Sequence, residues 1–410
     1  MNVRILALYD QPCPAMRGMR GKHWDIFCNV IDNFGDIGVC WRLARQLVAE
    51  HQRQVRLWVD DLASFRPLCP DLDPHLDIQV LRGVEVRRWT TPLPALATTD
   101  IADVVVEAFA CELPESYLAV MAARPEQDRP VWINLEYLSA ETWVGGCHGL
   151  ASPHPRLPLK KHFFFPGFAP FTPNSGGLLR EARLLEQRNA WQGDPAAAWA
   201  RLGLPQAQPG EISISLFCYE NPALPALLNA WTASAAPVRC LVPQGRALVQ
   251  TAASLGEPPL RPGAAVRQGN LTLHALPFVR QEEYDHLLWT CDLNFVRGED
   301  SFVRALWAAR PLVWHIYPQA EDAHLPKLSA FLDLYCANLP PAEAAAIRAF
   351  WQAWNRSDHD NTCGREVSAA WPAFFRQLPQ LSAHATRWSE RLASQTDLAS
   401  KLVFFCENLL

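Results

Sequence analysis

The sequence predicts an α/β protein built from two Rossmann-like domains, and three observations support this prediction. The chain has 410 residues, which is too long for one ordinary hydrophobic core. Apolar strands alternate with helical segments in two separate series, which begin near Trp24 and near Ile212. Most of the strands are continuous apolar runs, and such runs favour parallel sheets that are buried on both faces.

The first series contains a strand expected over residues 24–31 and a helix expected over residues 39–50. Further strands in this half are expected over residues 55–59, 78–81, 84–89, 104–108 and 131–135. Between about Ala151 and Leu204 the periodicity fades into a stretch rich in Pro, Gly and Phe. Such a stretch is typical of an interdomain crossing or a functional loop.

The second series repeats the alternation of strand and helix. Its strands are expected over residues 212–219, 238–242, 271–276, 293–296 and 312–317, and its helices over residues 224–233, 282–290 and 301–309. Residues 388–407 have helical spacing, and we expect them to fold back across the first domain.

Two domains follow from these two series. We expect an N-terminal Rossmann-like domain over residues 1–205, in which residues 1–22 are either an extension or the result of a misplaced start. A C-terminal helix at about residues 388–410 completes it. The second Rossmann-like domain then spans residues 206–387.

Composition excludes several classes of partner. The net charge is −5 and no run rich in Lys and Arg occurs, so nucleic acid is not an expected partner. The twelve cysteines contain no CxxC pair, and we interpret them as reduced residues of a cytoplasmic protein without a metal site. No apolar stretch is long enough to predict a membrane helix.

The first candidate site is a Gly- and carboxylate-containing turn between a strand and a helix. Asp32 and Asp36 flank this turn, while Asn33 and Gly35 permit a tight backbone path. Because such a turn lies at the carboxyl end of a sheet strand, the two carboxylates could bind a cation or remove a proton. Alternatively, Asp32 caps the helix and Asp36 is a first-turn acid favoured by the helix dipole.

The second candidate site is the turn at residues 297–304. Glu299, Asp300 and Ser301 stand where backbone N–H groups of the next helix converge, and this geometry suits phosphate oxygens. Arg297 could add positive charge, while Glu299 could face sugar hydroxyls or a basic acceptor. The alternative is a simple N-capping cluster with a solvated Glu299.

Aromatic residues also follow strands of the second domain. Tyr219 and Phe278 could stack on a nucleobase, and Gln281 and Tyr284 could read its edge. A buried aromatic residue is the commoner explanation for each taken singly. The Gly-rich P-loop and the GxGxxG fingerprint are absent, which disfavours an ordinary nucleotide hydrolase or dinucleotide dehydrogenase.

Four motifs carry a specific resemblance to a known family. They are IDNFGDIGVCWR at residues 31–42, WINLEYLS at 132–139, RGEDSFVR at 297–304 and WHIYPQ at 314–319. With these motifs the sequence resembles the EarP family, the protein-arginine rhamnosyltransferases that modify bacterial translation elongation factor P. The resemblance runs from Trp24 to the C-terminal helix, and it is weakest before Trp24 and in the loops between Gly145 and Pro173.

The resemblance implies a GT-B fold, with two Rossmann-like domains facing a cleft, and inverting transfer of rhamnose from dTDP-β-L-rhamnose to an arginine of elongation factor P. It implies no metal and no other cofactor. Asp36 is then the expected general base, supported by Asp32 and Glu299. The residues expected to bind the donor are Asn33, Gly35, Tyr219, Phe278, Gln281, Tyr284, Arg297, Asp300 and Ser301.

Paired carboxylates suit this chemistry because an arginine stays protonated in water and its nitrogens are poor nucleophiles. Asp32 and Asp36 could grip the guanidinium, orient one nitrogen and accept its proton as the new bond forms. Two alternatives remain at this point. One is a catalytically silent partner of elongation factor P, and the other is a GT-B-like epimerase acting on a free sugar nucleotide.

Overall fold

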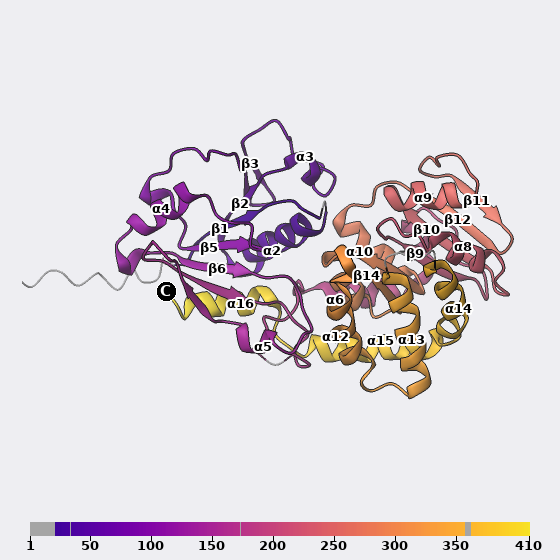
Figure 1. The fold of residues 1–410 in the computed structure, drawn as a ribbon. Helices are drawn as coiled ribbons and strands as arrows, with labels where there is room; N and C mark the ends of the chain where they lie inside the picture. The colour runs from indigo at the N-terminus through magenta and orange to yellow at the C-terminus, as the bar shows by residue number, and fades with distance from the viewer. Residues whose placement is uncertain (1–20, 33, 173, 357–361) are drawn as a thin grey trace, which may run out of the picture.

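The computed structural model describes residues 21–32, 34–172, 174–356 and 362–410, and it divides into two lobes that each contain a sheet (Figure 1). Asn33 and nearly all of the expected N-terminal extension lie outside the described residues.

The N-terminal sheet has the strand order β3-β4-β2-β1-β5-β6-β8-β7. Its strands are β1 (His23–Cys28), β2 (Gln54–Val59), β3 (Ile78–Leu81), β4 (Val84–Arg88), β5 (Val104–Ala108), β6 (Val131–Leu135), β7 (Ala151–Pro153) and β8 (Lys160–Phe164). The central strands pair in parallel, whereas β3 and β7 at the two edges are antiparallel to their neighbours. The helices of this half are α2 (Gly35–His51), α3 (Leu62–Phe65), α4 (Glu115–Ala123) and α5 (Val144–Cys147).

The C-terminal sheet has the order β11-β12-β10-β9-β13-β14 and is parallel except at β11. Its strands are β9 (Ile212–Leu216), β10 (Val238–Pro243), β11 (Ala265–Gln268), β12 (Leu271–Leu276), β13 (Leu293–Arg297) and β14 (Leu312–His315). The remaining helices are α6 (Leu184–Gln192), α7 (Pro195–Arg201), α8 (Leu224–Thr232), α9 (Arg246–Ser254), α10 (Gln281–Thr290), α11 (Asp300–Ala308), α12 (Leu325–Cys336), α13 (Pro341–Asn355), α14 (Cys363–Arg376), α15 (Leu378–Ala393) and α16 (Leu398–Glu407).

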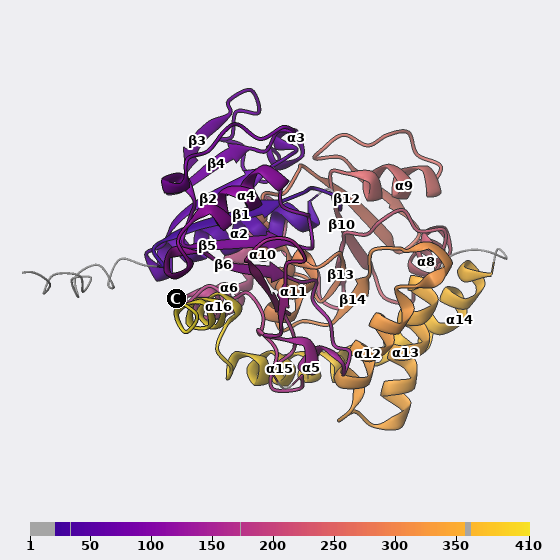
Figure 2. The ribbon, with the colours of Figure 1, turned by 60° about the vertical axis from the view of Figure 1, so that its left-hand side comes forward.

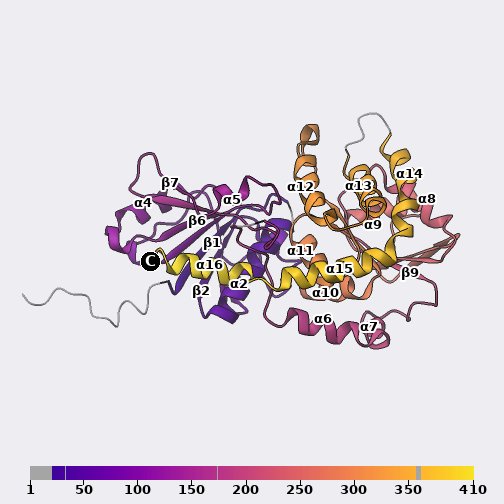
Figure 3. The same cartoon turned by 90° about the horizontal axis from the view of Figure 1, so that it is seen from below.

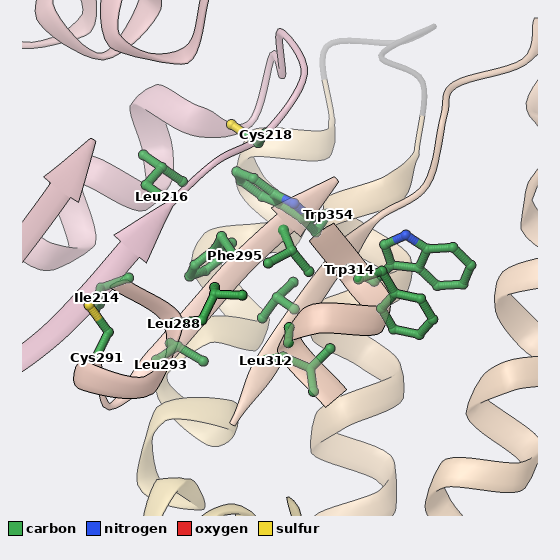
Figure 4. Close-up of a cluster of buried hydrophobic side chains, with 14 of the residues drawn as sticks. Ile214, Leu216, Cys218, Leu288, Cys291, Leu293, Phe295, Leu312, Trp314 and Trp354 are labelled. Atoms are coloured by element: carbon green, nitrogen blue, oxygen red, sulfur yellow. The ribbon is translucent and has the colours of Figure 1, made fainter. Parts of the chain in front are cut away.

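Each sheet is buried in its own apolar core. In the C-terminal half, residues of β9, β13 and β14 form one fully buried cluster beside Trp354 of α13 (Figure 4). The labelled strand residues of this cluster are Ile214, Leu216, Leu293, Phe295, Leu312 and Trp314. These strands are buried along almost their whole length, including the polar residues Ser213 and Ser215 of β9, as is typical of a parallel sheet covered on both faces. The predicted α/β class with two parallel-dominated sheets is confirmed.

The C-terminal segment differs from the single helix expected over residues 388–407. It forms two helices, α15 and α16, because the chain breaks at residues 394–397, where the Asp397 side chain accepts the Ser400 N–H and so caps α16. Seen from below, α15 lies under the C-terminal lobe and α16 under the N-terminal lobe (Figure 3). Leu398 and Leu402 of α16 enter the N-terminal core. Helix α16 therefore packs in the N-terminal half.

Two further boundaries differ from the sequence prediction. Helix α2 begins at Gly35 rather than at Val39, so residues expected to form a turn are the first turn of the helix. The stretch expected to be an irregular crossing begins with strands, since β8 pairs with β6 in the N-terminal sheet. The hydrophobic clusters group Trp191 and Trp199, from α6 and α7, with the C-terminal core. The limits of the two domains stay a prediction.

The two lobes meet where α2 and α11 lie side by side (Figure 2). Arg42 of α2 crosses this junction, since its Nε donates to the Asp300 carboxylate at 2.7 Å and its Nη2 donates to the Gln281 carbonyl at 3.0 Å. The chain segment between the lobes adds Glu181, which accepts from Arg304 Nη1 at 2.6 Å and from Arg42 Nη1 at 3.4 Å. The junction is thus a network of ion pairs that includes both lobes.

Among the helices that the structure describes, none combines the length and the apolar character that a membrane crossing requires.

Candidate functional site

The two predicted turns meet across the lobes, and Asp32 is the point of contact. Its Oδ1 accepts from Arg297 Nη1 at 3.1 Å, and its Oδ2 accepts from the Tyr219 hydroxyl at 2.5 Å. The N-cap residue of α2 is Phe34, whose side chain makes no capping hydrogen bond. The Asp32 carboxylate thus faces the other lobe, while Asp36 stands in the first turn of α2, as the helix-dipole alternative expected.

Asp36 lies in the first turn of α2, and its side chain folds back onto the turn before the helix. One carboxylate oxygen accepts the N–H groups of Ile31 and Asp32 at 2.9 and 2.8 Å, and the other accepts from the Tyr137 hydroxyl at 3.4 Å. The residue is only 3% exposed. Burial raises the pKa of Asp36, although the two backbone donors partly oppose this effect. Burial likewise raises the pKa of Asp32.

Glu299 is held in place by partners outside its own helix. It precedes α11 but makes no capping bond. Its Oε2 accepts the Leu138 N–H at 2.9 Å, and its Oε1 accepts from Lys327 Nζ at 2.7 Å. Burial raises the pKa of Glu299, and the neighbouring lysine opposes this shift. The alternative of a solvated capping residue is therefore wrong.

Gly35 allows the first turn to close on Asp32. A Cβ at position 35 would stand 2.5 Å from Asp32 Oδ2, which is far closer than side chains tolerate. The Gly35 N–H also donates to the Asp32 carbonyl at 2.6 Å. Glycine is therefore required by the close approach of the carboxylate rather than by a left-handed backbone.

The guanidinium of Arg297 is framed by aromatic rings. Its carbon lies 4.7 Å from the Phe217 ring centroid and 4.5 Å from that of Tyr219. The Ser301 hydroxyl accepts the Arg297 N–H at 3.0 Å and donates to the Arg297 carbonyl. Ser301 therefore fixes the second turn, and Arg297 projects from it toward the other lobe with an orientation set by stacking.

The donor candidates of α10 and α11 form a polar cluster. Gln281 Nε2 donates to the Gly38 carbonyl at 2.9 Å and to Asp300 Oδ2 at 3.0 Å. Tyr284 is buried, and its hydroxyl has no hydrogen-bond partner among the described residues. An unpartnered buried hydroxyl is costly, so this group is available to a ligand.

These residues line three neighbouring hollows in the protein. A cleft of about 1030 Å³ between the lobes is lined on its C-terminal side by Tyr219, Phe278 and Arg297, among others. A small cavity of about 60 Å³ beside it is lined by Gly35, Gln281, Tyr284, Asp300 and Ser301, among others. A cavity of about 230 Å³ lies on the other side of Asp32, and its walls include Asp36, Tyr137, Glu299 and Lys327.

Asp32 lines all three hollows, and Ile31 and Tyr317 line both the large cleft and the 230 Å³ cavity. A ligand in the cleft and a ligand in the cavity would therefore meet at Asp32. The structure thus brings together both predicted turns and every predicted site residue that it describes. The predicted role of each residue stays a prediction.

Sequence reasoning missed several lining residues. Tyr137 belongs to the motif at residues 132–139 and could have been found there, because it lies two residues after the end of a strand. Phe217 and Tyr317 also follow strands. Lys327 had no such signal, since it lies inside α12, and only the fold brings it to Glu299.

Within the ranges that the structure describes, no three His, Cys, Asp or Glu side chains lie close enough together to hold a metal ion. The absence of a metal from the reaction stays a prediction.

Comparisons with known proteins agree with the resemblance. A family model described as "Elongation-Factor P (EF-P) rhamnosyltransferase EarP" matches residues 24–407. A protein-arginine rhamnosyltransferase of Pseudomonas putida is 51% identical over 389 residues, which cover 94% of this chain and 99% of the relative. The protein of that name from Pseudomonas aeruginosa is 51% identical over 386 residues, with 93% and 98% covered.

A solved structure described as "Structural basis for EarP-mediated arginine glycosylation of translation elongation factor EF-P" aligns with a TM-score of 0.64 and 38% identity. The alignment covers 95% of this chain and 99% of the solved one.

Proposed function

The chain belongs to the EarP family of protein-arginine rhamnosyltransferases, and from this premise we propose that it transfers rhamnose from dTDP-β-L-rhamnose to an arginine side chain of translation elongation factor P. Its two Rossmann-like halves and the cleft between them form the predicted GT-B fold. One observation supports the proposal most strongly: Asp32 stands where a large cleft and a carboxylate-lined cavity join.

The sugar nucleotide fits the large cleft. Its C-terminal wall contains the aromatic rings of Tyr219 and Phe278, which suit a base or a sugar, and the cation Arg297, which suits a diphosphate. Helix α11 begins beside Arg297, so its first N–H groups add positive potential at the same place.

The acceptor guanidinium fits the 230 Å³ cavity. Asp32, Asp36 and Glu299 offer it carboxylate oxygens, and the Tyr137 ring, stacked on Phe109 at 4.5 Å, offers a flat aromatic wall. Charge-assisted hydrogen bonds to carboxylates hold a planar guanidinium in one orientation. They would direct one of its nitrogens toward the donor sugar past Asp32.

The transfer step is a single displacement. The guanidinium nitrogen forms a bond to the anomeric carbon of rhamnose while the bond from that carbon to the diphosphate oxygen breaks, and the configuration inverts. Asp36 accepts the proton from the attacking nitrogen, so no neutral arginine has to exist beforehand. The leaving dTDP carries the electron pair away, and Arg297 with the α11 amides stabilises its growing charge. We expect these groups to suffice without a metal.

The test is the intact mass of elongation factor P after incubation with this protein and dTDP-rhamnose, with a chelator present. We expect a gain of one deoxyhexose that peptide mapping places on an arginine. Reactions without donor, and with a factor whose modified arginine is replaced by lysine, serve as controls. No gain despite measurable donor binding would contradict the proposal. Conversion of the donor in the absence of any acceptor would instead identify an epimerase.

A further inference from the structure

Glu299, one of the three carboxylates of the cavity, forms an ion pair with a lysine from a distant helix. Lys327 comes from α12, and its Nζ lies 2.7 Å from Glu299 Oε1. The second oxygen, Oε2, accepts the Leu138 N–H at 2.9 Å. The carboxylate is therefore fixed at both oxygens, yet each oxygen keeps a further lone pair for a ligand.

The ammonium also faces an aromatic ring. Lys327 Nζ lies 5.6 Å from the centroid of the Tyr137 ring, which is within the range of a cation–π contact. Lys327 is the only Lys or Arg among the described residues that line this cavity. The cavity therefore already holds one tethered cation between Glu299 and Tyr137.

The groups that face Glu299 from the other elements include further carboxylates, so Glu299 needs the positive charge of Lys327 to stay ionised. Asp36 of α2 is a like charge that disfavours ionisation of Glu299, and Asp32 lines the same cavity. His324, just before α12, accepts the Gln319 N–H at Nδ1, and its Nε2 lies 2.8 Å from the Asn355 carbonyl oxygen, so both ring nitrogens are engaged away from Glu299. The Tyr137 hydroxyl donates to Asp36. Among the described lining residues, Lys327 alone can supply positive charge to Glu299.

Each carboxylate of the cavity thus has its own support. Asp32 has Arg297 and Tyr219, and Asp36 has two backbone N–H groups. A buried carboxylate without such support takes up a proton and can no longer bind a guanidinium.

We propose that Lys327 is a positioning residue of the acceptor site, which holds Glu299 in place and negatively charged before the acceptor guanidinium enters. The proposal rests on the proposed function for the identity of that guanidinium. The role of Lys327 toward Glu299, however, does not depend on the acceptor.

The first readout therefore needs no substrate. The side-chain carboxyl carbon of Glu299 is followed by NMR against pH in protein labelled at its glutamates, with the signal assigned by its loss in Glu299→Gln. We expect Lys327→Met to raise the pKa of Glu299 by about one to three units and Lys327→Arg to leave it close to the wild-type value. An unchanged titration in Lys327→Met would overturn the proposal.

The matched control is Lys161→Met. Lys161 is 24% exposed, against 25% for Lys327, and it also pairs with a buried glutamate, Glu107, at 3.3 Å. Neither Lys161 nor Glu107 lines the 230 Å³ cavity. We expect this variant to leave the titration of Glu299 unchanged, and binding of dTDP verifies that each variant is folded.

The second readout is the pH profile of kcat/KM for transfer. With Lys327→Met we expect the acid limb to move to higher pH, with activity recovering at alkaline pH. Lys327→Arg should restore the wild-type profile, and Lys327→Met should add no further shift in a Glu299→Gln background. A loss of equal size at every pH would assign Lys327 a merely structural role and overturn the proposal. If the titration shifts but the wild type modifies no elongation factor P, the proposed function fails while the role of Lys327 stands.

Discussion

At the scale of single residues, loss of the Asp36 carboxylate should lower the rate of transfer and leave binding of the donor almost unchanged. Asn at this position keeps the shape of the side chain, and its carbonyl oxygen can still accept the N–H groups of Ile31 and Asp32. It cannot take up a proton. We therefore expect Asp36→Asn to lower the rate of transfer by about 10²–10⁴-fold while the affinity for dTDP-rhamnose stays within a factor of about two. Single-turnover transfer and calorimetric titration of the donor measure the two quantities.

Asp61→Asn is the control for Asp36→Asn. The Asp61 carboxylate also accepts backbone N–H groups at the start of a helix, but it caps α3 and lines neither the cleft nor the 230 Å³ cavity. Transfer by this variant should match that of the wild type. Substantial activity in Asp36→Asn would remove this residue as the base.

Some site residues could be predicted from the sequence and others could not. Asp32, Asp36 and Glu299 were identifiable because each stands near the junction of a strand with the helix that follows it, and strand ends of a parallel sheet gather at one edge. Lys327 was not identifiable, because its function depends on a contact with Glu299 that only tertiary packing creates. The role of Asp36 within α2 was also hidden, since its side chain stabilises the backbone before the helix.

At the scale of elements, apolar runs predicted most of the strands correctly. The boundaries of helices were predicted wrongly where the local composition does not match the structure. Gly35 and Gly38 disfavour a helix, yet α2 begins at Gly35. Gly38 instead allows close approach, since a Cβ there would meet Gln281 at 3.3 Å and Asp300 at 3.4 Å. The break between α15 and α16 was missed because both helices share one apolar spacing. The first helix ends at its C-cap, Ser394, and the second begins after Asp397, which caps α16.

Helix α16 should contribute strongly to the stability of the N-terminal half. Leu402 is fully buried in the N-terminal core, whereas Phe404, two residues later, is 68% exposed. We expect Leu402→Ala to lower the free energy of unfolding by about 2–5 kcal/mol, because it leaves a cavity. Phe404→Ala should change it by less than about 0.5 kcal/mol. Urea unfolding measures both variants, and equal effects would show that α16 does not pack as described.

At the scale of the whole molecule, Glu181 ties the lobes together. Along the chain, Glu181 lies between the strands of the N-terminal sheet and those of the C-terminal sheet. Its carboxylate accepts hydrogen bonds from Arg304 at 2.6 Å and from Arg42 at 3.4 Å. Burial alone would raise the pKa of Glu181, but Arg304 and Arg42 more than offset this and lower it well below its ordinary value. A carboxyl group with a depressed folded-state pKa stabilises the fold above its unfolded-state pKa, and this stability is lost as pH falls toward the folded-state value.

We therefore expect Glu181→Gln to be less stable than the wild type at pH 7 by about 1–3 kcal/mol. The difference should shrink as pH falls below about 4.3, the ordinary pKa of a glutamate. Thermal unfolding across this pH range measures the difference. Glu186→Gln, which removes an exposed partner of Arg183, should behave as the wild type at every pH. If the difference in stability between Glu181→Gln and the wild type does not change with pH, the charge of Glu181 is not what stabilises the junction.

The course of the chain through both lobes has a consequence for the order of synthesis. The N-terminal core contains β1 and α2, near the start of the chain, together with Leu398, Leu402 and Cys406 of α16, near its end. The N-terminal lobe is translated first, but its hydrophobic core is completed last. Helix α16, which belongs to this core, leaves the ribosome only after the entire C-terminal lobe. A chain cut short before α16 would retain Asp36 in its sequence but would lack part of the core beneath the helix that carries it.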